Sequence, residues 1–171
     1  MSEPIAIDDA TRRMVGQLEK TTLESLSHED HVRAAWYYLV EHGLLGTLER
    51  LPGVLRRFAA SKGAADHYHE TITFAYTCLI HERLSRSRAR TWPEFAAENP
   101  DLLEREFLGR YYDAETLKGT FARRVFVLPD PASGAFVDDF DMEEIETNRD
   151  LLARLKKGSQ DAREGKGRFV G

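Results

Sequence analysis

The sequence predicts an all-α protein, an irregular helical bundle with a helical extension at its C-terminal end. Apolar residues recur at three- and four-residue spacing, and capping residues or glycines mark several segment ends. The chain has 171 residues, of which 42% are hydrophobic, enough for one buried core. We expect a compact helical domain with a histidine cluster over residues 1–129. A linker and an acidic helical tail are expected over 130–171.

The first half of the chain carries clear signals for helix ends. Ser27 followed three residues later by Asp30 has the pattern of a capping box. The helix that begins there is expected to end near Gly43. Pro52 interrupts the next apolar repeat, which predicts a kink or two short helices. An earlier helix is expected over residues 8–25.

The second half predicts one long helix and several short ones. Residues 67–86 form the longest expected helix, and Thr91 before Pro93 predicts the start of another. Further helices are expected over residues 101–111, 114–123 and 143–157. The apolar run at 125–128 is too short to assign to a strand or a helix.

Charge and cysteine content exclude several classes. The net charge of -5 argues against general binding to nucleic acid or to a membrane surface. Cys78 is the single cysteine, so no internal disulfide forms, and a cytoplasmic location is expected. No apolar run approaches the roughly 18 residues of a membrane span. The acidic start of the chain does not resemble a signal peptide.

Histidines suggest a metal site between two helices. His28 and His31 are three residues apart and therefore share one helix face. At 100° per residue, His69 falls in the apolar stripe of the 67–86 helix, with Glu70 and Thr73 beside it. We expect His28, His31 and His69 to bind a divalent metal. Glu70 would act as a fourth ligand or a base, and Thr73 as a supporting hydroxyl.

Such a ligand set is suited to iron, zinc or manganese. With an open coordination position, the metal would serve an enzyme acting on a small-molecule substrate, through oxygenation on iron or zinc-assisted hydrolysis. The alternative is that these histidines are structural, each with its own hydrogen-bond partner. Likewise, Trp36 and Tyr76 either line a ligand pocket or belong to the core.

Residues 28–128 resemble a group of short bacterial proteins of unassigned function. The resemblance lies in HEDHVRAAWYYL at 28–39, YHETIT at 68–73 and RRVFVLPD at 123–130. It covers about three-fifths of the chain. It implies that these segments form one unit, and it implies no activity.

The tail, residues 141–170, resembles the toxin-binding ends of some bacterial type II antitoxins. The resemblance implies a non-catalytic interaction module that binds a protein partner through Ile145, Leu151, Leu152 and Leu155. The preceding part of the chain lacks the strand-rich DNA-binding domain that such antitoxins usually carry. A tail docked on a second copy would instead make a homodimer.

Overall fold

The computed structural model describes residues 4–129. Contacts separate the chain into two units, Met1–Ser133 and Gly134–Gly171, and the described residues belong to the first. Residues 4–129 contain α-helices and short 3-10 helices and no β-strand, which confirms the all-α class. Within this range, no helix combines the length and the apolar character needed to cross a bilayer.

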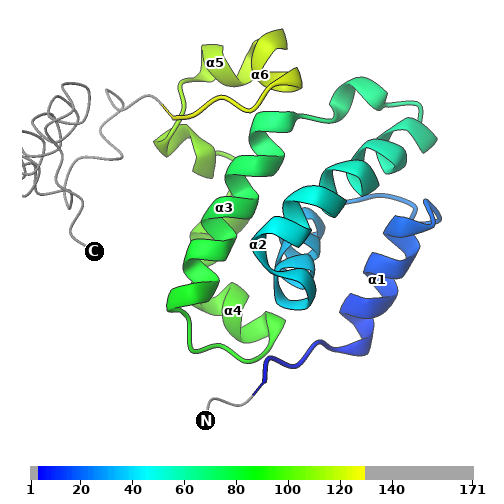
Figure 1. The fold of residues 1–171 in the computed structure, drawn as a ribbon, viewed down its shortest axis with the longest axis vertical. Coiled ribbons are helices and arrows are strands. Elements are labelled where there is room, and N and C mark those ends of the chain that lie inside the picture. The colour runs from blue at the N-terminus through cyan, green and yellow to red at the C-terminus, as the bar shows by residue number, and fades with distance from the viewer. Residues whose placement is uncertain (1–3, 130–171) are drawn as a thin grey trace, which may run out of the picture. The chain divides into compact units, whose positions relative to one another are not determined.

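Helix α2 lies between α1 and α3, and α6 packs on α3 (Figure 1). The α-helices are α1 Asp9–Glu19, α2 His28–Ser61, α3 Glu70–Arg86, α4 Trp92–Glu98, α5 Ala114–Lys118 and α6 Thr120–Arg124. Three 3-10 helices cover Ala65–His67, Pro100–Leu103 and Phe107–Arg110.

Both expected helix starts, at Ser27 and Thr91, form, and each has a capping box. The Ser27 side chain accepts a hydrogen bond from the Asp30 backbone N–H at 3.1 Å, and the Asp30 carboxylate accepts from the Ser27 N–H at 3.0 Å. Thr91 and Glu94 pair in the same reciprocal way at the start of α4. These local bonds satisfy N–H groups that the first helical turn leaves free, so both starts are readable from sequence.

The break in α2 lies at Gly43 and not at Pro52. Gly43 has φ 66° and ψ -177°, a backbone conformation that glycine alone adopts readily, and it joins two helical segments. Pro52 lies inside the second segment with helical backbone angles. The expected interruption at Pro52 is therefore wrong. Proline's fixed φ is itself helical, and the buried ring packs within the core at this position.

Several predicted helix bounds also change. Helix α1 ends at Glu19, six residues before the expected end, and Thr21 follows with φ 58°. The expected helix over 101–111 is replaced by two 3-10 helices, the first of which begins at Pro100. Local side-chain hydrogen bonds to the backbone, such as the one that the Asp101 carboxylate accepts from the Leu102 N–H at 3.1 Å, favour tight turns there over a continuous helix. Residues 125–128 have no regular structure.

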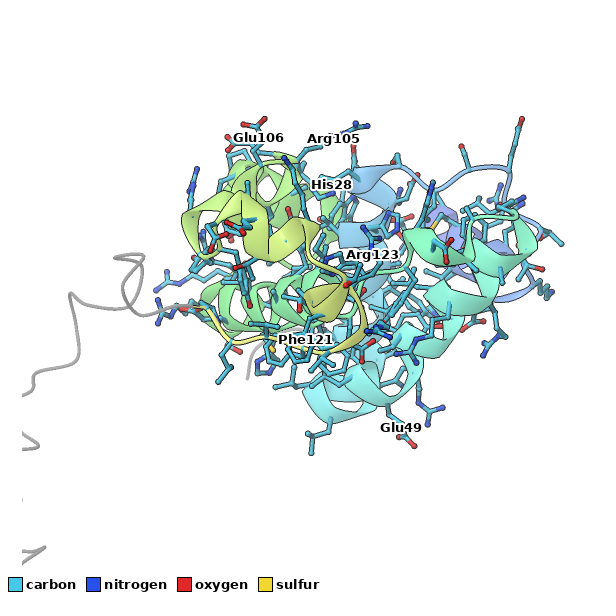
Figure 2. The ribbon with its side chains drawn as sticks, turned by 90° about the horizontal axis from the view of Figure 1, so that it is seen from above. His28, Glu49, Arg105, Glu106, Phe121 and Arg123 are labelled. Carbon is cyan, nitrogen blue, oxygen red and sulfur yellow. The ribbon has the colours of Figure 1, made fainter. Side chains whose placement is uncertain are left out.

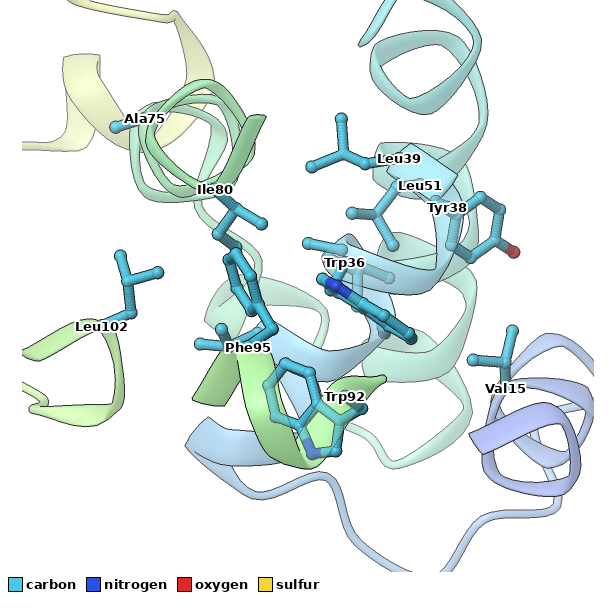
Figure 3. Close-up of a cluster of buried hydrophobic side chains, with 14 of the residues drawn as sticks. Val15, Trp36, Tyr38, Leu39, Leu51, Ala75, Ile80, Trp92, Phe95 and Leu102 are labelled. Atoms are coloured by element: carbon cyan, nitrogen blue, oxygen red, sulfur yellow. The ribbon is translucent and has the colours of Figure 1, made fainter. Parts of the chain in front are cut away.

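An aromatic cluster joins α2, α3 and α4 in the core (Figure 3). The Trp36 and Trp92 rings meet edge to face with centroids 5.8 Å apart, and Phe95 packs against both. Ile80 of α3 is fully buried beside them. Because this cluster anchors the first half of α2 against α3, the first turn of α2 lies next to the middle of α3.

Candidate functional site

A hollow between α2 and α3 contains the first pair of predicted residues. His28 and His31, from the first turn of α2, line an inner chamber of about 160 Å³. The opposite wall comes from α3, through Ile72, Thr73 and Tyr76. The remaining lining residues are mostly apolar: Val32, Ala35, Leu51, Leu55 and Thr77. The predicted face shared by His28 and His31 therefore points into a defined space.

His31 has a ring nitrogen free for a ligand. Its Nδ1 lies 2.8 Å from the Ser27 carbonyl oxygen, which can only accept, so Nδ1 carries the proton. In the neutral ring, Nε2 then has an open lone pair, and no residue among 4–129 donates to it. Desolvation lowers the pKa of His31 and outweighs the hydrogen bond to Ser27. His31 is therefore a neutral acceptor at pH 7, and the residue as a whole is exposed to solvent.

His28 is held more firmly than His31. Its Nε2 donates to the Leu102 carbonyl oxygen at 3.0 Å, and its ring meets the Tyr76 ring edge to face at 5.3 Å. The Tyr76 hydroxyl donates to the Glu104 carbonyl oxygen at 3.3 Å. Burial raises the pKa of Tyr76 to about 12, so the hydroxyl stays protonated. These contacts tie the first turn of α2 and α3 to the segment after α4.

His69 is a helix cap and not a member of the α3 stripe. Its backbone is extended, and its Nδ1 accepts from the Ile72 N–H at 3.3 Å. Its Nε2 donates to the Leu117 carbonyl oxygen of α5 at 2.9 Å. Burial, the largest cause, lowers the pKa of His69 and keeps the ring neutral. Both ring nitrogens are thus engaged, and the expected placement of His69 on the helix face is wrong because α3 begins one residue later.

Glu70 and Thr73 line different hollows of the structure. The Glu70 carboxylate pairs with Arg56 and accepts from the Tyr68 hydroxyl at 2.8 Å. It lines a separate hollow with Arg123. Thr73 lines the inner chamber with the two α2 histidines. The structure therefore brings together His28, His31 and Thr73 at this chamber, and His31 and Thr73 also line a neighbouring hollow with His69.

The expected metal ligands do not converge in the described part of the chain. Over residues 4–129, no group of three His, Cys, Asp or Glu side chains is arranged to hold a metal ion. The predicted set of His28, His31, His69 and Glu70 is divided because His69 and Glu70 have other partners. Iron, zinc or manganese binding stays a prediction.

The inner chamber adjoins a wider hollow of about 850 Å³. His28, His31, Ile72 and Tyr76 line both spaces. The outer wall carries four charged side chains, and Figure 2 shows Arg105 and Glu106 on the same side of the molecule as His28. These charged residues are Arg105, Glu106, Arg110 and Lys118.

Sequence reasoning did not single out the residues of this outer wall. Arg105, Arg110 and Lys118 lie in or beside short helices that reach the hollow only through the path of the chain after α4. Tyr76 is different, because the sequence predicted that it either lines a ligand pocket or belongs to the core. It turns out to line the pocket.

The predicted partner-binding residues of the tail, Ile145, Leu151, Leu152 and Leu155, lie outside the described residues. Binding of a protein partner or a second copy through them stays a prediction. Comparison of the chain with models of protein families, with characterised proteins and with solved structures found no match. The geometry of the hollow is therefore the basis for a functional proposal.

Proposed function

We propose that this protein binds a small organic molecule in the hollow between α2 and α3. The observation that carries the proposal is the His31 ring: its Nδ1 is anchored on Ser27, its Nε2 has no partner among residues 4–129, and the residue lines a mostly apolar chamber. Ligand sites commonly combine apolar walls with a few polar groups of fixed orientation. His31 supplies such a group, and Val32, Leu55 and Ile72 supply apolar wall.

The same arrangement is suited to proton transfer. A neutral histidine whose tautomer is set by a backbone carbonyl presents its free nitrogen as a base. A ligand hydroxyl that donates to His31 Nε2 would also be the group from which a proton is taken. An enzymatic role for this site would rest on that step.

The test compares phenol with toluene, which has nearly the same shape and no donor. We expect phenol to bind the full chain in ligand-observed NMR titrations, with toluene weaker by about fivefold, because one uncharged hydrogen bond contributes about 1 kcal/mol. His31→Phe should remove the preference for phenol. His81→Phe is the matched control, because His81 of α3 lines none of the hollows described above.

Ile72→Trp provides an independent check, because Ile72 lines both the chamber and the wider hollow. The larger side chain should fill the space and reduce binding of both probes. Circular dichroism establishes that each variant is folded. Equal binding of phenol to the wild type, His31→Phe and Ile72→Trp would refute the proposal, as would no binding to the wild type.

A metal-dependent enzyme is the second candidate, favoured by the two histidines of one helical turn at the same chamber. Metal content of tag-free protein, measured by plasma mass spectrometry, tests it. About one equivalent of iron, zinc or manganese that is lost in His31→Ala would support a metal centre. A content below about a tenth of an equivalent after reloading would exclude it.

A further inference from the structure

We propose that the ligand of this hollow is an anionic molecule with a single ring. The ring would occupy the inner chamber, and its carboxylate or similar group would face Arg105 and Lys118 at the outer wall. This inference rests on the proposed function and adds to it the chemical class of the ligand.

The size of the inner chamber indicates a single ring. Its volume of about 160 Å³ is close to that of engineered apolar cavities of roughly 150 Å³ that bind benzene. Val32, Ala35, Leu51, Leu55 and Ile72 supply an aliphatic wall. A fused two-ring body would extend beyond this space.

The charges of the outer wall favour an anion. Arg110 is already paired, with Asp101 at 3.3 Å and Glu104 at 3.4 Å. Arg105 and Lys118 are exposed and have no ion pair with any residue among 4–129. Among residues 4–129, Glu106 is the single acidic residue that lines this hollow.

The two unpaired cations therefore outnumber Glu106 at the opening. A carboxylate can accept two parallel hydrogen bonds from an arginine, which adds orientation to the attraction. The apolar chamber and the cationic hollow are neighbours, because His31, Ile72 and Tyr76 line both. His31 Nε2 is thus available to a ring hydroxyl of a ligand whose acidic group points outward.

The test uses 3-hydroxyphenylacetate and its neutral amide, 2-(3-hydroxyphenyl)acetamide, which differ in charge and hardly in shape. Affinities for the full chain are measured by calorimetry at low ionic strength. We expect the acid to bind about five- to tenfold more tightly than the amide, with the advantage reduced by added salt.

Charge variants locate the effect. Arg105→Gln combined with Lys118→Gln should abolish the preference for the acid by lowering its affinity to about that of the amide. Arg88→Gln combined with Lys20→Gln is the matched control: both residues are exposed and line none of the hollows described above. Glu106→Gln should increase the preference.

The outcomes separate this inference from the proposed function. Equal affinities of the acid and the amide in the wild type would overturn the inference and leave the binding site in place. A preference that survives in the Arg105/Lys118 double variant would also overturn it. Absence of binding by either probe, and by phenol, would remove the proposed function itself.

Discussion

Replacing His69 tests whether this residue is structural. Its ring caps α3 through Ile72 and reaches α5 through Leu117, and the residue is only 6% exposed. Loss of the cap costs about 1 kcal/mol, and loss of the hydrogen bond to Leu117 costs about 1 kcal/mol more. The space left by the missing ring adds about 1 kcal/mol. We therefore expect His69→Ala to lower the free energy of unfolding by about 3 kcal/mol.

Urea denaturation followed by circular dichroism measures the effect. His69→Asn keeps an oxygen able to cap α3, so it should recover about 1 kcal/mol of the loss. His81→Ala is the control on the same helix, because the His81 side chain makes no hydrogen bond with residues 4–129, and it should change stability by about 0.5 kcal/mol or less. If His69→Ala and His81→Ala have equal urea midpoints, the ring of His69 is not held as described. It would then be available as the metal ligand that the sequence predicted.

Three further predictions concern pH and helix ends. The pKa of His69 is lowered in the folded chain, so the unfolded chain takes up a proton first. Stability should fall as the pH drops below the ordinary value of 6.5 toward the folded pKa, and this loss should be smaller in His69→Asn when urea midpoints are compared from pH 7.5 to 5. Gly43→Ala should lower the free energy of unfolding by about 1–3 kcal/mol, because alanine is strained at φ 66°; an unchanged midpoint would contradict the break at this residue. Thr91→Ala removes a helix cap and should cost about 1 kcal/mol in the same assay, whereas Thr120→Ala, at an exposed threonine whose side chain makes no hydrogen bond with residues 4–129, serves as the comparison.

Local signals explain which elements could be predicted. Ser27 and Thr91 begin helices because each finds its partner, Asp30 or Glu94, three residues away. Gly43 marks the break in α2 because the required φ is intrinsic to glycine. Pro52 was misleading because the effect of a proline on a helix depends on the packing around its ring, and this ring is buried inside α2.

The candidate site was only partly predictable. The three-residue spacing of His28 and His31 was enough to place them on one face of a helix. Their roles depend on the backbone carbonyl groups that accept hydrogen bonds from their rings, such as the carbonyl of Leu102. The spacing of residues in the sequence does not reveal these partners. His69 was misplaced because its cap depends on where α3 begins and on the approach of Leu117 from α5.

By itself the sequence determined the all-α class, the starts of α2 and α4 and the pairing of His28 with His31, because these depend on periodicity and on contacts a few residues apart. Only the tertiary structure decided that His69 serves as a cap, that Glu70 pairs with Arg56, and that Arg105 and Lys118 reach the hollow of His31. The physical reason is that ring nitrogens and charged groups bind whichever partners the packed chain brings to them. Such partners lie tens of residues away, as with His69 and Leu117.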